Sequence, residues 1–366
     1  MKSTHTEELY IKKNNLTNSI FDEKSIFFDI ETTGFSPSSS SIYMIGCARR
    51  KGNLICIDQF FAETPDEEKV ILSAFIELIK QYSTIISYNG VGFDIPFIKA
   101  KCKKYNLSES FKKYNYLDIF KSVSTIKFLL KLENYKQKSI EKFLGLKRND
   151  KFSGGELINV YYEYMKEPSD DKLELLYLHN YEDVLGMTEL IPILSYIELL
   201  NGQYTITETN ISNYTDYNKT HRNEFLITLQ NDYVLPQKVS TRNDIFHIVM
   251  NTETTVIRIP IIESQLKFFY SNYKDYYYLP AEDNAIHKSV ASFVDSEYKE
   301  KCHAYNCYTK KQSMFLPQTQ SIMHPEFKNE YKDKITYFEL TEDFSSSDIM
   351  LRRYVDHIFK YMLKSK

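Results

Sequence analysis

The sequence of 366 residues has no long apolar run, and this absence excludes several classes of protein. No stretch approaches the roughly 20 apolar residues that a membrane-spanning helix needs. The first fifteen residues mix both charges and lack an apolar segment and a small-residue cleavage site, so they do not resemble a secretory signal. We therefore expect a soluble, cytoplasmic protein with no membrane partner.

Paired cysteines are also absent. The chain has five cysteines, an odd number, and no two of them are spaced as CxxC. This pattern argues against a disulfide framework and against a zinc ribbon, so we expect reduced thiols. The five residues are Cys47, Cys56, Cys102, Cys302 and Cys307.

The composition is that of a globular protein, with 42% hydrophobic and 26% charged residues, and the length allows two domains. Charge is unevenly distributed. Residues 95–155 contain 15 basic and 5 acidic side chains, a net charge of +10, whereas residues 201–366 contain 20 basic and 21 acidic, a net charge of −1. The basic excess either attracts a polyanion such as nucleic acid or is a solvated helix surface.

Hydrophobic periodicity predicts an α/β domain in the first part of the chain. The expected strands are Ser25–Ile30, Ile42–Arg49, Leu54–Phe61, Thr84–Tyr88 and Tyr116–Ile119. The expected helices are Asp66–Gln81, Ile95–Tyr105, Phe120–Leu132, Lys138–Leu144, Glu156–Met165 and Lys172–Leu200.

The domain prediction has four parts. Residues 1–21 are a flexible arm, residues 22–200 the α/β domain, and residues 201–223 a linker rich in Thr, Asn and Tyr. Residues 224–366 form a second, α+β domain of unknown role, with short strands and with helices at Asp283–Phe293 and Asp348–Leu363.

Two acids interrupt the first predicted strand, in the run SIFFDIETTGF. Asp29 and Glu31 lie two residues apart, so on a strand their side chains share one face with roughly 7 Å between their Cα atoms. Buried carboxylates this close repel each other unless a cation compensates, and a hard divalent ion such as Mg²⁺ or Mn²⁺ would do so. The alternative is an exposed strand end with solvated acids.

Two further polar groups follow. In SYNGVGFDIPFI, Asp94 stands at the start of a predicted helix, where it is either a functional carboxylate or an N-cap. In YLHNYEDVLGM, His179 and Asp183 are four residues apart, so on a helix they share one face. They are either part of a site or an ordinary surface contact.

These motifs together resemble the DEDD (DnaQ-like) 3′-5′ exonucleases, which have the ribonuclease H-like fold. FDIETTGF is similar to their first motif, YNGVGFDIPFI to the second as found in the proofreading domains of family B DNA polymerases, and HNYEDV to the third. The LDIF run at Leu117–Phe120 and the run SGGELINVYYEY are most similar to the YprB-type ribonuclease H-like domain. The resemblance implies a mixed five-stranded sheet flanked by helices over about residues 22–200.

The resemblance also implies two-metal hydrolysis of a phosphodiester, with two divalent cations, Mg²⁺ or Mn²⁺, as cofactors. Asp29 would bind both ions, Glu31 and Asp183 one of them, and Asp94 the other. His179 would be the general base, because its ordinary pKa of about 6.5 suits proton transfer at pH 7. It stands at the spacing of the tyrosine branch of the family, so a role as substrate contact stays open.

Four residues match family positions that contact the substrate. Thr32 and Thr33 would hold the terminal nucleotide, and Asn89 would contribute from the second motif. Phe35 would stack on the last base or pack in the core. The lysines on and after the helix that follows Asp94 would track the phosphate backbone: Lys99, Lys101, Lys103, Lys104, Lys112 and Lys113.

The sequence therefore predicts a metal-dependent 3′-5′ exonuclease whose partner is nucleic acid with a 3′ end, DNA or RNA. Two alternatives remain open. One is a nucleic-acid-binding or scaffold module that has the fold without catalysis, and the other is a structure-specific endonuclease.

Overall fold

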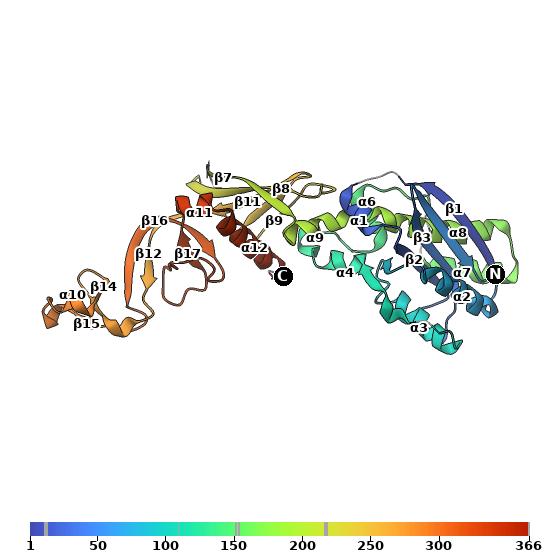
Figure 1. The fold of residues 1–366 in the computed structure, drawn as a ribbon, viewed down its shortest axis with the longest axis horizontal. Coiled ribbons are helices and arrows are strands. Elements are labelled where there is room, and N and C mark those ends of the chain that lie inside the picture. Colours follow the sequence, from blue (N-terminus) through green and yellow to red (C-terminus); the bar gives the residue numbers. More distant parts are fainter. Residues whose placement is uncertain (11–13, 109, 151, 153, 216–218, 365–366) are drawn as a thin grey trace. The chain divides into compact units, whose positions relative to one another are not determined.

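The computed structural model describes residues 1–10, 14–108, 110–150, 152, 154–215 and 219–364. The chain divides into two compact units (Figure 1). Unit 1 comprises Met1–Leu199 with Tyr233–Gln237, and unit 2 comprises Leu200–Asp232 with Lys238–Lys366. Among the described residues, no helix combines the length and the apolar character needed to cross a bilayer. All five cysteines are buried and free.

Unit 1 is built on a six-stranded mixed sheet with the strand order β1-β4-β3-β2-β5-β6. The first four of these strands pair antiparallel, and β5 and β6 continue the sheet parallel to β2. The strands are β1 (Lys2–Leu9), β2 (Ser25–Thr32), β3 (Ile42–Lys51), β4 (Leu54–Phe61), β5 (Thr84–Ser87) and β6 (Asn115–Asp118).

Strand β1, which was not among the five predicted strands, corrects the prediction of a flexible arm at residues 1–21. β1 pairs with β4 from Lys2 opposite Phe61 to Leu9 opposite Leu54, so its backbone groups are hydrogen-bonded along one edge. Helix α1 (Asn15–Ile20) follows, capped by the Asn14 side chain, which accepts from the Thr17 amide at 2.7 Å. Residues 11–13 of the predicted arm lie outside the described residues.

Helices cover both faces of this sheet. Alternate β2 residues Ile26, Phe28 and Ile30 face a core shared with α2 (Glu68–Ile79) and α3 (Asp94–Lys104). The opposite face packs against α7 (Gly154–Lys166) and α8 (Asp170–Glu189). Because side chains alternate along a strand, Asp29 and Glu31 lie on the face covered by α8.

Helix α8 approaches the sheet closely because β3 has a glycine opposite it. A Cβ on Gly46 would lie 2.1 Å from the Asn180 Oδ1 atom and 2.7 Å from a Val184 methyl carbon. The same Asn180 oxygen accepts a hydrogen bond of 3.0 Å from the Gln59 side chain on β4. These contacts fix the face of α8 that carries His179 and Asp183 against β2 and β3.

The remaining helices of unit 1 are short. They are α4 (Ile119–Ser124), α5 (Lys127–Leu130), α6 (Gln137–Leu144) and α9 (Ser195–Leu200). The helix predicted over Phe120–Leu132 is broken between α4 and α5, and that over Lys172–Leu200 is interrupted by a 3₁₀ turn at Ile191–Leu194. Pro192 lies in that turn and lacks the amide that a continuous helix needs.

The predicted linker at residues 201–223 is wrong for most of its length. β7 (Tyr204–Thr215) and β8 (His221–Asn231) form an antiparallel hairpin, with Tyr204 opposite Asn231 and Thr215 opposite His221. The polar Thr and Asn side chains that resembled a linker lie on solvent-exposed positions of an edge strand. Residues 216–218, between the two strands, lie outside the described residues.

Unit 2 is richer in strands than the prediction. A five-stranded sheet has the order β7-β8-β11-β10-β9, and two three-stranded sheets have the orders β12-β16-β17 and β14-β13-β15. The further strands are β9 (Val239–Arg242), β10 (His247–Met250), β11 (Thr254–Pro260), β12 (Ile262–Phe269), β13 (Tyr276–Leu279), β14 (Asn284–His287), β15 (Glu300–Lys301), β16 (Tyr308–Gln318) and β17 (Thr336–Glu339).

Three helices complete the described part of unit 2. They are α10 (Lys288–Ala291), α11 (Glu342–Ser346) and α12 (Asp348–Lys364). Helix α12 confirms the predicted C-terminal helix and packs through Tyr354 against Phe246 and Phe338. The helix predicted over Asp283–Phe293 is wrong in its first half, where β14 pairs with β13, and only α10 is helical.

Candidate active site

The two acids of the first motif lie near the end of β2, on the side covered by α8. Glu31 is buried, with 9% of its surface exposed, and Asp29 is partly exposed. Both face an open cavity of about 590 Å³ that Asp94, His179 and Asp183 also line. The structure therefore brings together all five residues predicted as catalytic.

Asp94 is the first residue of α3, and its carboxylate reaches across to β2. Its Oδ1 atom accepts a hydrogen bond of 3.3 Å from the Ile30 amide. That amide is available because β2 pairs with β5 only from Ser25 to Phe27. The N-cap position is occupied by Phe93 rather than by Asp94, so the N-cap alternative is wrong.

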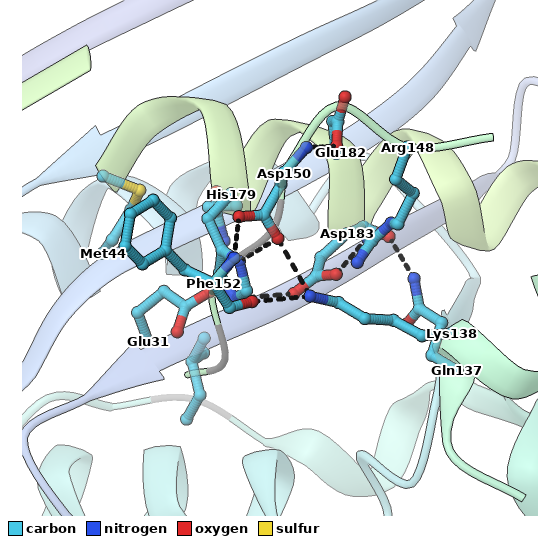
Figure 2. Close-up of polar contacts among 12 residues, drawn as sticks. Glu31, Met44, Gln137, Lys138, Arg148, Asp150, Phe152, His179, Glu182 and Asp183 are labelled. Atoms are coloured by element: carbon cyan, nitrogen blue, oxygen red, sulfur yellow. Dashed lines mark hydrogen bonds and ion pairs between the residues drawn. The ribbon is translucent and has the colours of Figure 1, made fainter. Parts of the chain in front are cut away.

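His179 and Asp183 lie one turn apart on the face of α8 that is directed toward Glu31, as Figure 2 shows. The His179 Nε2 atom is 3.2 Å from Asp183 Oδ2 and 3.7 Å from Glu31 Oε1. Only 4% of the surface of His179 is exposed, so the pair is not an ordinary surface contact. Tyr181 points away and donates to Glu8 on β1 at 2.7 Å.

Desolvation and mutual repulsion raise the pKa values of three of these carboxyls. Desolvation raises the pKa of Asp29 well above its ordinary value, and Glu31 and Asp94 add to the increase. Burial raises the pKa of Glu31 to about 7 although His179 opposes the shift. Burial likewise raises the pKa of Asp94 to about 7, against two backbone hydrogen bonds. Within the described part of the chain, no lysine or arginine forms an ion pair with any of the three.

The loop between α6 and α7 supplies residues that the sequence did not reveal. The Asp150 Oδ2 atom is 2.7 Å from His179 Nδ1 and accepts from the Lys138 ammonium at 3.0 Å (Figure 2). Hydrogen bonds from Lys138, the Phe152 amide and His179 lower the pKa of Asp150, although burial alone would raise it. Asp150 appeared in the sequence only as one charge in a basic segment.

Arg148 in the same loop pairs with the last acid of the third motif. Its guanidinium contacts Asp183 Oδ1, and its Nε atom is 2.9 Å from Glu141 Oε2. Glu182, beside Asp183 on α8, accepts the amides of Asn149 and Asp150 at 3.0 and 2.8 Å. The loop is thus held to α8 by charged and backbone contacts, and no spacing in the sequence indicates this.

Of the four predicted substrate residues, Asn89 lines the cavity, whereas Thr32, Thr33 and Phe35 are not among its lining residues. Phe35 is 90% exposed and contacts only the edge of Phe93 among the ring contacts of the described residues, so the core-packing alternative is wrong. The Thr32 hydroxyl donates to the Gly34 carbonyl at 2.9 Å, and the Thr33 hydroxyl accepts from the Ser41 amide at 2.9 Å. Asn89 is exposed and lines the cavity with φ of 64°.

The Asn89 turn is held by Asp118 at the end of β6. Its carboxylate accepts the amides of Asn89 and Val91 at 3.0 and 3.1 Å and caps α4 through the Lys121 amide at 3.1 Å. Asp118 therefore shapes the backbone beside Asp94.

One lysine of the predicted basic surface is not on the surface. Lys101 is buried, lies 3.1 Å from Glu68 Oε1 and donates to the Ser40 carbonyl. It neutralises a buried acid on α2, so it cannot contact a phosphate backbone. The other five are exposed: Lys99, Lys103, Lys104, Lys112 and Lys113.

The site fits a divalent cation. Ligand atoms of Glu31, His179 and Asp183 all lie within 4.8 Å of one another. Glu31 Oε1 is buried and accepts no hydrogen bond from the described residues, which is costly for a carboxylate oxygen unless a cation contacts it. Carboxylate oxygens are the ligands that Mg²⁺ and Mn²⁺ prefer.

One family model matches residues that lie within unit 1. A family model described as the RNase_H superfamily matches residues 26–195, less than half of the chain. A DNA polymerase of Methanocaldococcus jannaschii is 32% identical over 92 residues, which are 23% of this chain and 6% of the polymerase. This chain therefore spans only a small part of that relative.

Two solved structures also resemble this chain. The family B DNA polymerase of the archaeon Pyrobaculum calidifontis is 19% identical, with a TM-score of 0.37 over 46% of this chain and 25% of that one. The zinc-bound complex of E. coli exonuclease I with single-stranded DNA is 14% identical, with a TM-score of 0.28 over 57% and 54% of the two chains. The family match and the mixed sheet with helices on both faces define unit 1 as a domain of ribonuclease H-like fold.

Proposed function

We propose that unit 1 is a metal-dependent nuclease that removes nucleotides from the 3′ end of DNA or RNA. One observation carries the proposal: Asp29, Glu31 and Asp94 surround one open cavity with raised pKa values and, among the described residues, without a lysine or arginine partner. Buried acids that are not paired within the protein are stabilised when a cation binds them.

Two divalent cations, Mg²⁺ or Mn²⁺, fit the four carboxylates. Asp29 would be shared by the two ions, Glu31 and Asp183 would hold one, and Asp94 would hold the other. When bound, such ions make water a stronger nucleophile and stabilise the charge of a phosphodiester undergoing hydrolysis.

The residues around the acids have roles in binding and orientation. Arg148 and Lys138 neutralise Asp183 and Asp150, which fixes the α6–α7 loop beside the cavity. The exposed Phe35 ring offers a terminal base an apolar surface, and such stacking contributes on the order of 1 to 3 kcal/mol. The exposed lysines after Asp94 would attract the phosphate backbone.

The comparisons support the nuclease class without deciding direction or metal number. The residues matched by the family model, 26–195, include all four acids and His179. The relative that is 32% identical over 92 residues is a DNA polymerase. Within the superfamily we place the domain nearest to the YprB type, on the LDIF and HNYEDV runs.

The test uses single-stranded DNA and RNA labelled at the 5′ end, with the 3′ end either free or chemically blocked. In Mn²⁺ or Mg²⁺ we expect a ladder of products shortened from the free 3′ end, and none with a chelator. Asp29→Asn should slow cleavage by at least about 10³-fold, because it removes the ligand shared by both ions. Asp66→Asn, an exposed acid outside the cavity, is the matched control.

Three outcomes would contradict the proposal. Internal cleavage of the blocked substrates would indicate an endonuclease. Binding of the substrates without cleavage in either metal would indicate a scaffold module. Equal activity of the Asp29→Asn variant and the wild type would exclude these carboxylates from the reaction.

A further inference from the structure

The two ring nitrogens of His179 contact different groups. Nδ1 lies 2.7 Å from Asp150 Oδ2, while Nε2 is directed toward Glu31 and Asp183 (Figure 2). The imidazole is buried between them and cannot rotate freely. Its orientation is therefore set by Asp150 rather than by solvent.

Asp150 is itself held firmly. Only 2% of its side chain is exposed, Oδ2 accepts from Lys138 at 3.0 Å, and Oδ1 accepts from the Phe152 amide at 2.9 Å. Its own amide donates to Glu182 at 2.8 Å. An ionised carboxylate only accepts hydrogen bonds, so Nδ1 of His179 is the donor to Asp150, and in this tautomer the lone pair of the imidazole is on Nε2.

The Nε2 lone pair lies close to two carboxylate oxygens, Asp183 Oδ2 and Glu31 Oε1, and one ion could contact all three atoms. The distances from Nε2 to Asp183 Oδ2 and Glu31 Oε1, 3.2 and 3.7 Å, exceed the roughly 2.7–2.9 Å of a charged hydrogen bond. They match the separations of roughly 3 to 4 Å between ligand atoms bound to one ion at about 2.1 Å. Glu31 Oε1 is buried, has no hydrogen bond to any described residue, and lies within ligand distance of the other two atoms.

The remaining contacts leave this point accessible to a cation. Arg148 contacts the other oxygen of Asp183, Oδ1, so Oδ2 stays directed toward His179. A histidine that binds a metal through one nitrogen commonly donates through the other to a carboxylate, which fixes its tautomer. His179 has this arrangement with Asp150.

We propose that His179 is a metal ligand through Nε2, so that Glu31, His179 and Asp183 hold one nitrogen-ligated divalent ion, and that Asp150 is the residue that positions the imidazole. The inference rests on the proposed function, since the ion is one of the two proposed there. A nitrogen ligand favours transition metals over Mg²⁺, so this position prefers Mn²⁺ to Mg²⁺.

The test is pulsed electron paramagnetic resonance of the full chain loaded with Mn²⁺, which detects nitrogen bound to the metal without measuring activity. We expect ¹⁴N modulation in the wild type, replaced by a ¹⁵N pattern when only histidine is labelled. His179→Gln should abolish the modulation and weaken Mn²⁺ binding by about 10- to 100-fold, with a smaller change for Mg²⁺. Asp150→Asn should keep the modulation and weaken Mn²⁺ binding by about 10-fold.

The matched control is His5→Gln. His5 also contacts a carboxylate through Nδ1, at 2.7 Å from Asp58, and belongs to the other His, Glu and Cys group that could hold a metal. This control should keep the full modulation.

The outcomes separate this inference from the proposed function. A protein that binds Mn²⁺ tightly but shows no histidine nitrogen overturns the inference and leaves the four-carboxylate nuclease intact. Modulation that His5→Gln removes also overturns it. A protein that binds no Mn²⁺ overturns both, and the labelled wild type decides the matter even if a variant fails to fold.

Discussion

The acids of the two units differ in how their charge is balanced. In unit 1, Asp29, Glu31 and Asp94 crowd one cavity and have raised pKa values. In unit 2, Asp283 pairs with Lys310 and accepts the hydroxyls of Tyr278 and Tyr308, which lower its pKa below the ordinary value.

A second acid of unit 2 follows the same rule. Glu224 is buried, and both of its oxygens accept from the Arg258 guanidinium. Asp283 and Glu224 are neutralised by a lysine or an arginine, whereas Asp29, Glu31 and Asp94 have no such partner among the described residues and would be stabilised by a cation from solution. The contrast locates the expected chemistry in unit 1.

The largest difference should appear in catalysis. Asp94→Asn should reduce metal-dependent cleavage by about 10²- to 10³-fold, because it removes a charged ligand while keeping an oxygen for the Ile30 amide. Asp283→Asn, the same chemical change in unit 2, should leave the rate within about twofold of the wild type. Single-turnover rates on one substrate measure both. Equal losses would mean that acids of both units serve the reaction.

Metal binding should stabilise unit 1 selectively. Mn²⁺ at 100 times its dissociation constant should add about 2.7 kcal/mol to the free energy of local unfolding where it binds. Hydrogen exchange read by mass spectrometry would follow peptides from β2 and α8, and peptides from β13 and β14 as reference. Protection in β13 and β14 equal to that in β2 would contradict a site confined to unit 1.

Without metal, removing a charge from the cavity should stabilise the protein. The pKa of Glu31 is raised from 4.5 to about 7, so the folded chain holds a proton on this carboxyl at pH values where the unfolded chain has lost it. The stability that this protonation gives is fully present below pH 4.5 and is lost as the pH rises through 7. Glu31→Gln should therefore gain about 1 to 2 kcal/mol at pH 8 in chelator, and nothing at pH 4.

Urea denaturation of the full chain at the two pH values measures this gain. Glu224→Gln provides the comparison in unit 2, because it leaves the Arg258 guanidinium without its partner and should destabilise at pH 8. A loss of stability in Glu31→Gln at pH 8 would mean that the cavity acids are already compensated.

The sequence predicted the acids of the site better than their surroundings. Periodicity placed Asp29 and Glu31 on one face of a strand and Asp183 on a helix face shared with His179, and the resemblance to the DEDD exonucleases joined them into one expected site. Asp150 and Arg148 could not be found in this way. They lie in an irregular loop, and their importance comes from contacts with α8 that are distant in sequence.

The errors in the fold have related causes. β1 reads KSTHTEEL, an edge strand whose exposed positions carry no apolar alternation, and its pairing with β4 depends on a partner some 50 residues away. Lys101 is buried because Glu68 on α2 lies beneath it. Neither a polar edge strand nor a buried ion pair leaves a periodic signal in the sequence.

The smallest expected effect is a loss of stability in unit 2 as the pH falls, opposite in sign to the effect of Glu31 in unit 1. His357 on α12 is buried, and its Nε2 atom accepts from the Thr319 amide at 3.1 Å. Burial, aided by Lys360, lowers the pKa of His357 from 6.5 to about 4. Between these two pH values the unfolded chain binds a proton at His357 and the folded chain does not. The free energy of unfolding therefore falls as the pH decreases from 6.5 toward 4. We expect a loss of about 1 kcal/mol between pH 6.5 and pH 5.

Hydrogen exchange in α12 peptides measures this loss, after correction for the intrinsic pH dependence of exchange. His357→Gln should abolish the loss, because the amide oxygen of glutamine accepts the hydrogen bond from the Thr319 amide without titrating. Over the same range, metal-free β2 peptides should become more protected as pH falls, because the raised pKa of Glu31 acts in the opposite direction. A response of the same sign in α12 and β2 would contradict one of the two pKa shifts, because burial lowers the pKa of a base and raises that of an acid.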